Sequence, residues 1–142
     1  MTDEHLRRIG QHLPTLERPG FRFGEWVPSR RDDGGALHLG WYEPSEAAES
    51  FLADVRAWIE PFAWPAWAES AEGQRLLGHP DAVASASAED LRRLLIVYVR
   101  AERFGDGTLE AAFESGMLTA IVRRAAALAG EADAPGPETA GR

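Results

Sequence analysis

The strongest structural signal in the chain is the sequence SAEDLRRLLIVYVRAER at residues 87–103. Ser87 and Asp90 form an S-x-x-D box, a pattern that caps the first turn of a helix. Leu94 to Val99 are all apolar, so a helix here would be hydrophobic on every side. A helix of this kind normally lies in the middle of a bundle. The sequence therefore predicts a mainly α fold, a helical bundle around a central buried helix at about residues 88–103.

Helical spacing of apolar residues predicts shorter helices on both sides of this segment. The expected ranges are residues 3–13, 46–60, 64–77, 109–115 and 118–129. Proline lacks an N–H donor and glycine favours left-handed turns, so both interrupt helices. The expected interruptions are Pro14, Pro61, Gly78, Pro80 and Gly116. The chain is therefore predicted to be one helical domain over residues 1–129, followed by a disordered tail over residues 130–142 that is rich in Ala, Pro, Gly and Glu.

Residues 21–42 have the pattern of a small β-hairpin. Short apolar segments surround the turn-rich sequence Asp32-Asp-Gly-Gly35. After this turn, Leu37, Leu39 and Trp41 alternate with His38, Gly40 and Tyr42. Such alternation is typical of a strand with one buried face. The bundle is therefore predicted to carry a small hairpin near its N-terminus.

Composition limits the classes of protein that fit the chain. It has 142 residues, 23 acidic and 15 basic, with a net charge of −8 and no cysteine. The excess of acidic charge argues against general attraction to nucleic acid or to an anionic membrane, so neither partner is expected. The longest apolar run, Leu94 to Val99, is far shorter than the roughly 20 residues that a membrane-spanning helix needs. The N-terminus lacks an apolar leader, and we expect a cytoplasmic protein.

A dense polar motif, RAERFGDGTLEAAFESG, occupies residues 100–116. Arg100 and Arg103 share one helix face because residues three or four apart are neighbours on a helix, and Glu110 and Glu114 share another face for the same reason. The short Gly105-Asp106-Gly107 turn can fold the second helix back onto the first. We therefore expect Arg100 or Arg103 to pair with an acidic residue of the motif, the candidates being Glu102, Asp106, Glu110 and Glu114.

This motif resembles an uncharacterised family of small bacterial and archaeal proteins, a domain of unknown function. The resemblance rests on the pattern R-x-E-R-F-x-x-G-x-L at Arg100 to Leu109, followed by E-S-G at Glu114 to Gly116. Two further features look similar to the family, namely Phe62-x-Trp64-x-x-Trp67 and the sequence Tyr42-x-Pro44-Ser45. The resemblance covers roughly residues 20–128 and leaves the first helix outside. It implies a shared fold and no particular activity.

Five tryptophans are numerous for a chain of this length. Large aromatic side chains supply much of the buried area of a core, so we expect most of them to lie inside the protein. The same side chains also favour partner surfaces, and Trp64 and Trp67 are candidates for an aromatic surface of this kind.

Three classes of function stay open. No catalytic, metal-binding or nucleotide-binding motif is visible, so we predict no catalytic residue, metal or cofactor and favour a non-enzyme. The preferred interpretation is a protein-interaction or regulatory module with a mainly structural Arg/Glu motif, acting through a protein partner or self-association. One alternative is a helix-turn-helix-like nucleic-acid binder over residues 108–125, which requires a basic face formed by Arg92, Arg93, Arg123 and Arg124. The other is an enzyme or small-ligand binder with a pocket around Arg100, Arg103, Glu110 and Glu114.

Overall fold

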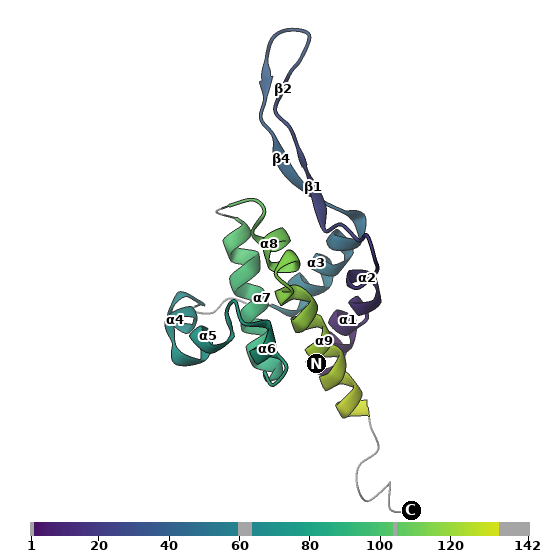
Figure 1. Ribbon diagram of the computed structural model, residues 1–142, viewed down its shortest axis with the longest axis vertical. Coiled ribbons are helices and arrows are strands. Elements are labelled where there is room, and N and C mark those ends of the chain that lie inside the picture. The colour runs from purple at the N-terminus through teal and green to yellow at the C-terminus, as the bar shows by residue number, and fades with distance from the viewer. Residues whose placement is uncertain (1, 60–63, 104, 134–142) are drawn as a thin grey trace, which may run out of the picture.

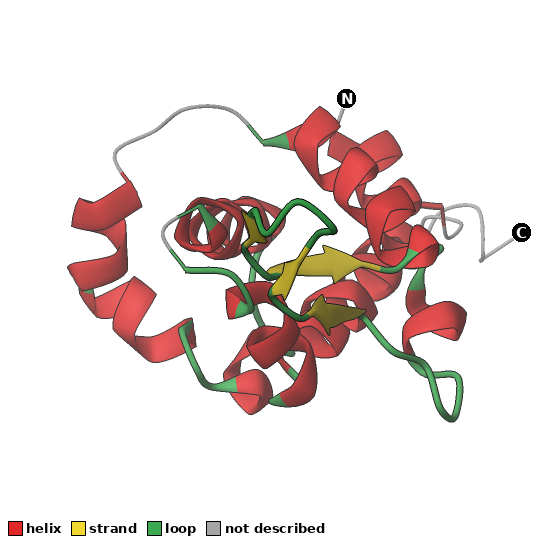
Figure 2. Cartoon of the chain, turned by 90° about the horizontal axis from the view of Figure 1, so that it is seen from above, coloured by secondary structure: helices red, strands yellow, loops and turns green. Residues whose placement is uncertain are grey.

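A helical body and a β-hairpin that projects from it make up the structure, a computed structural model that describes residues 2–59, 64–103 and 105–133 (Figure 1). The helices are α1 (Thr2–Gly10), α2 (Leu13–Leu16), α3 (Glu46–Trp58), α4 (Trp64–Glu69), α5 (Ala71–Leu76), α6 (Pro80–Val83), α7 (Ala88–Glu102), α8 (Thr108–Glu114) and α9 (Met117–Asp133). The strands are β1 (Gly24–Val27), β2 (Arg30–Arg31), β3 (Leu37–His38) and β4 (Trp41–Pro44). The predicted mainly α fold with a small hairpin is confirmed. Seen from above, the strands lie over the middle of the surrounding helices (Figure 2).

The central helix α7 forms where the apolar run predicts it. The Ser87 hydroxyl oxygen accepts a hydrogen bond from the Asp90 N–H at 3.1 Å, which caps the first turn. The side chains of Leu94, Leu95 and Ile96 are buried, whereas Tyr98 is only partly buried. Burial on nearly every side stabilises this helix inside the bundle, as the sequence indicates.

The last helix, α9, is a second central element. It contacts α1, α2, α6, α7 and α8, and Leu118, Ile121 and Val122 on it are fully buried. Helices α1 and α9 lie side by side (Figure 1). They approach so closely that a Cβ atom on Gly10 would lie 2.7 Å from the Cα of Ala126. Helix α9 continues to Asp133, so residues 130–133 of the predicted tail belong to a helix. The rest of the predicted tail lies outside the described residues.

Two prolines that were expected to end helices lie instead in the first turn of one. Pro14 lies at the start of α2 and Pro80 at the start of α6, where a missing N–H costs nothing because the first N–H groups of a helix have no partner within it. The helix predicted for residues 64–77 is divided into α4 and α5 at Ser70. The Ser70 hydroxyl oxygen accepts a hydrogen bond from the Gly73 N–H at 3.1 Å and so begins a new helix.

The four strands form one continuous hairpin. Strand β1 pairs antiparallel with β4, and β2 pairs antiparallel with β3. Both pairs have the same register, so the second pair continues the first toward the tip of the hairpin. At the tip, the Asp32 carboxylate accepts hydrogen bonds from the N–H groups of Gly34 and Ala36, both at 2.9 Å, which stabilises the turn. The base of the hairpin packs on the helical body through Phe23 and Tyr42, which are buried. Its outer part extends away from the body (Figure 1).

None of the helices in the described ranges is both long and apolar enough to cross a membrane.

Candidate functional site

The carboxylate of Glu102 caps a helix across the α7–α8 loop. Its Oε1 atom accepts a hydrogen bond from the Leu109 N–H at 2.9 Å, and its Oε2 atom accepts one from the Gly107 N–H at 3.1 Å. These donors lie at the N-terminus of α8, where N–H groups have no partner within the helix and attract negative charge. Gly107 has a φ of 97°, a conformation that favours glycine. The Glu102 carboxylate therefore binds backbone N–H groups of the same polar motif.

Two more acidic residues of the motif hold the base of the hairpin. The Tyr42 hydroxyl donates a hydrogen bond to Oε1 of Glu110 at 3.1 Å, and the Tyr42 N–H donates to Oδ2 of Asp106 at 3.4 Å. Burial raises the pKa of the Tyr42 phenol, and the nearby carboxylates of Glu110, Glu102 and Glu114 raise it further. The phenol therefore stays protonated and remains a donor over the physiological pH range.

The pairing predicted for the motif is wrong. Over the parts of the chain that the structure describes, neither Arg100 nor Arg103 has a carboxylate within hydrogen-bond or ion-pair distance. The physical reason is competition, because backbone N–H groups and a phenol bind the carboxylates of Glu102, Asp106 and Glu110 first. Glu102, Asp106 and Glu110 of the motif therefore bind backbone N–H groups and Tyr42, while Arg100 and Arg103 pair with no described carboxylate.

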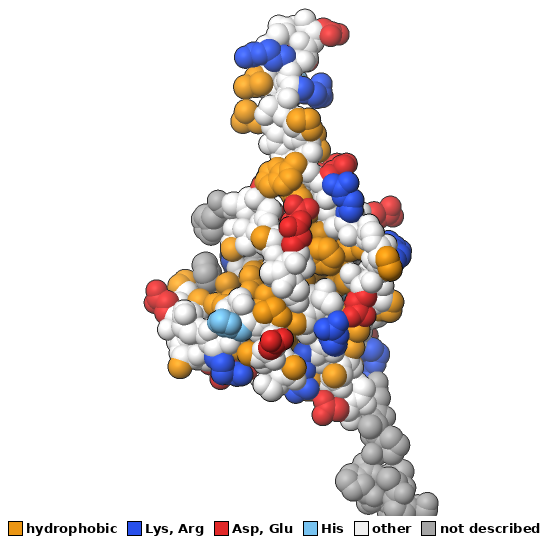
Figure 3. Space-filling view, in the orientation of Figure 1, with side chains coloured by type: hydrophobic (Ala, Val, Ile, Leu, Met, Phe, Trp, Pro, Cys, Tyr) orange, Lys and Arg blue, Asp and Glu red, His pale blue; other side chains and the backbone are white. Residues whose placement is uncertain are grey.

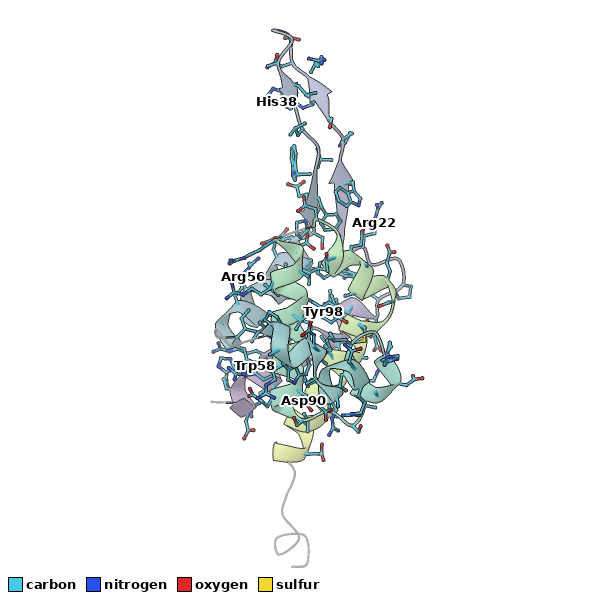
Figure 4. All side chains as sticks on the ribbon, turned by 90° about the vertical axis from the view of Figure 1, so that its left-hand side faces the viewer. Arg22, His38, Arg56, Trp58, Asp90 and Tyr98 are labelled. Atoms are coloured by element: carbon cyan, nitrogen blue, oxygen red, sulfur yellow. The ribbon has the colours of Figure 1, made fainter. Side chains whose placement is uncertain are left out.

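Both arginines line a pocket of about 370 Å³, which we call the arginine pocket. Arg56, on α3, completes a set of three guanidinium groups around it. Figure 4 shows Arg56 on the flank of the helical body, below the hairpin. The apolar part of the lining consists of Phe23, Pro44, Leu52, Ile59, Val99 and Leu109. Tyr42, Glu49 and Glu102 also line it, whereas Glu110 and Glu114, which the sequence places beside the arginines, do not.

The charges of the arginine pocket favour an anion. The guanidinium groups of Arg56, Arg100 and Arg103 form no hydrogen bond or ion pair with any described residue. Glu49 opposes them with one exposed carboxylate, while the charge of Glu102 is partly balanced by the N-terminus of α8. The free charge facing the pocket is therefore positive in a chain whose net charge is −8.

The helix-turn-helix alternative is not supported by the geometry. Helices α8 and α9 are joined by a short turn at Gly116, as predicted, but the first turns of α9 are buried in the bundle. A recognition helix must expose its N-terminal residues to a DNA groove. The basic face that this alternative requires is also neutralised, because Arg92 and Arg93 both pair with Glu89, and Arg123 pairs with Glu17.

The predicted aromatic surface is not formed by Trp67, whose side chain is buried. The structure does not describe the side chain of Trp64. The exposed large apolar side chains lie instead on the hairpin, with exposed fractions of 56% for Trp26, 52% for Leu37, 71% for Leu39 and 44% for Trp41. The alternating pattern of residues 37–42 predicts a strand with one apolar face, and the structure shows that this face is exposed.

Metal binding finds no support in this arrangement. Among the residues that the structure describes, no group of three or more His, Asp or Glu side chains could hold a metal ion. His12 and His38 each lie beside one carboxylate, those of Asp54 at 2.7 Å and Asp32 at 3.0 Å. A single histidine–carboxylate contact of this kind is a structural hydrogen bond rather than a metal site.

A model of a family of unknown function, DUF6508, matches residues 1–131. The predicted resemblance to a domain of unknown function is confirmed, and the match includes the first helix, which the resemblance had left outside. No curated protein and no solved structure matches the chain.

Proposed function

We propose that this chain, which belongs to the family of unknown function DUF6508, binds a small anionic molecule with an apolar portion in the arginine pocket. The observation that carries the proposal is the set of three arginines, Arg56, Arg100 and Arg103, that surround one pocket and have no partner among the described residues. Guanidinium groups bind carboxylates and phosphates through two parallel hydrogen bonds, and they keep their charge at any physiological pH.

The distribution of ion pairs elsewhere supports this assignment. Acidic residues outnumber basic ones by 23 to 15, so carboxylates are available to pair with arginines. Arg8, Arg75 and Arg123 each pair with one, on α1, α5 and α9. Arg30 on the hairpin also lacks a carboxylate partner among the described residues, but Arg56, Arg100 and Arg103 differ from it because they surround one pocket. An external anion in that pocket would supply the missing negative charge.

The size and lining of the arginine pocket indicate what the ligand carries besides its anionic group. Small-molecule sites typically enclose about 300–1,000 Å³ and combine a mostly apolar wall with a few polar groups that orient the ligand. The arginine pocket has about 370 Å³, an apolar wall that includes Phe23 and Leu52, and three arginines in its lining. A compact aromatic or aliphatic carboxylate, or a phosphate monoester, matches this combination. A polymer such as nucleic acid matches it less well.

Calorimetric titration with four probes tests the proposal. We expect phenyl phosphate and benzoate to bind, inorganic phosphate to bind more weakly because it lacks the apolar portion, and benzyl alcohol to bind at least about tenfold more weakly than benzoate because it lacks the charge. Arg100→Gln or Arg103→Gln should weaken benzoate binding about tenfold or more, since a hydrogen bond to a charged group contributes about 1.5–3 kcal/mol.

Arg30→Gln is the matched control. Arg30 is also exposed and has no side-chain partner among the described residues, but it lies on the hairpin and does not line the pocket. This variant should bind benzoate as the unmodified chain does. Equal loss in all three variants, or equal affinity for benzoate and benzyl alcohol, would contradict an anion site at this position.

A further inference from the structure

The hairpin has one face toward the helical body and one face toward solvent. Because the register is continuous and side chains alternate along a strand, Trp26 and Tyr42 share one face with Gly24. This inner face contacts the body, since a Cβ atom on Gly107 would lie 2.8 Å from the Trp26 ring and the Tyr42 side chain is buried. The opposite face, which we call the outer face, carries Glu25, Val27, Arg31, Leu37, Leu39, Trp41 and Glu43.

The middle of the outer face is an apolar patch without a partner. Leu37, Leu39 and Trp41 are all exposed there, and Val27 is half-buried. Figure 3 shows hydrophobic side chains along the projecting hairpin, well clear of the helical body. A two-stranded hairpin is at best marginally stable in water unless its apolar face packs on something. This patch therefore favours a partner that covers it.

The two ends of the outer face carry opposite charge. At the base, Glu25 lies directly opposite Glu43, and like charges in this position destabilise a strand pair. No cation pairs with either carboxylate among the described residues. Toward the tip, Arg31 donates a hydrogen bond only to the Gly35 carbonyl oxygen, at 3.0 Å, and no described carboxylate neutralises it. Base and tip thus complement each other in charge but lie too far apart to meet within one hairpin, about 20 Å along the strand.

We infer that the outer face binds the outer face of a second copy of this chain, with the two hairpins antiparallel. In this arrangement a two-fold axis lies between the two outer faces, at a level midway between Glu25 and Arg31. Arg31 of each copy then lies against the Glu25–Glu43 pair of the other. Trp41 of each copy packs on Leu39 of the other. Each contact occurs twice, as a symmetric dimer requires.

The shape of the molecule permits this dimer. The hairpin projects from one end of the helical body (Figures 1 and 3), so an antiparallel pair places the two bodies at opposite ends. An unrelated partner would have to supply an apolar centre flanked by acidic and basic ends in the reverse order. A second copy carries that pattern already. The interface is small, so we expect a dissociation constant on the order of micromolar.

Charge reversal across the interface gives a decisive test. In a dimer of Arg31→Glu, a new carboxylate faces Glu43 of the other copy, and in a dimer of Glu43→Arg, a new guanidinium faces Arg31. Each variant alone should therefore be monomeric in sedimentation equilibrium. Mixing the two variants restores opposite charge across the interface, and an equimolar mixture should form a heterodimer. These side chains are exposed, so the fold should be unaffected, and far-ultraviolet circular dichroism checks this.

Two further variants sharpen the result. Leu39→Asp on the outer face should raise the dissociation constant at least about tenfold, whereas Arg30→Glu, on the inner face, should leave it unchanged. A strict monomer at all concentrations overturns the inference, and so does dimerisation of both charge variants alone without preference for the mixture. These measurements use no ligand and no residue of the arginine pocket, so their outcome is independent of the proposed function.

Discussion

Adjacent residues at the end of α7 should differ sharply in their effect on stability. Glu102→Ala removes the acceptor for two backbone N–H groups, those of Gly107 and Leu109. A hydrogen bond to a charged group contributes about 1.5–3 kcal/mol, and loss of a helix cap costs about 0.5–2 kcal/mol. Because Glu102 is only half-buried, water can replace part of what is lost, and we expect a decrease of about 2–3 kcal/mol in the free energy of unfolding. Arg103→Ala removes an exposed side chain that pairs with no described residue, and should cost less than about 0.5 kcal/mol.

Urea denaturation of the two variants measures this difference. The transition midpoint should fall clearly for Glu102→Ala and hardly at all for Arg103→Ala, with the slope unchanged in both. Glu102→Gln keeps one oxygen acceptor and should give an intermediate loss. The double variant should equal the sum of the single variants to within about 0.5 kcal/mol, since the two side chains do not interact. Breaking a buried ion pair costs about 3 kcal/mol or more. A loss of this size for Arg103→Ala, or equal losses for Glu102→Ala and Arg103→Ala, would refute the conclusion that Glu102 stabilises the fold while Arg103 has no structural partner.

Two further predictions concern packing and pH. Gly10→Ala should destabilise the protein by about 1–3 kcal/mol, because the new methyl group would collide with Ala126 on α9. Gly130, which lies on α9, has open space around it, so Gly130→Ala should stabilise the protein by about 0.4–1 kcal/mol. Thermal unfolding measures both changes. Stability should fall as pH rises above about 10, because the raised pKa values of Tyr42 and Tyr98 keep both phenols protonated in the folded state after they ionise in the unfolded state. The chain has no lysine or cysteine to titrate in this range, so replacing both tyrosines with phenylalanine should remove the loss of stability above pH about 10. If the loss of stability persists in that variant, the two tyrosines are not its cause.

The helices that the sequence predicts correctly combine a cap with a long apolar pattern. Ser87 and Ser45 cap α7 and α3, and in each helix the apolar residues that follow are buried. The short helices were harder to predict, because a single local hydrogen bond decides them. Nothing in the composition around Ser70 distinguishes a cap from an ordinary helical serine, and the division between α4 and α5 depends on its contact with Gly73.

The sequence predicts which polar residues come near one another at the end of α7, but not which of them form contacts. Spacing alone places Arg100 and Arg103 on one face and brings the acidic residues near them. It does not reveal that the backbone at the start of α8 competes for Glu102, since that competition depends on the geometry of the loop. Arg56 was missed because it comes from α3, distant in sequence, and carries no motif of its own.

The packing of α1 along α9 has a consequence for the synthesis of the protein. The ribosome delivers α1 well before α9, yet the two helices are neighbours in the finished bundle. Until α9 has emerged, the apolar side of α1 that carries Leu6 and Ile9 has no α9 to pack on, and it stays available to chaperones. Helix α9 therefore closes the bundle over α1, and premature termination before α9 leaves a chain in which α1 lacks its main partner.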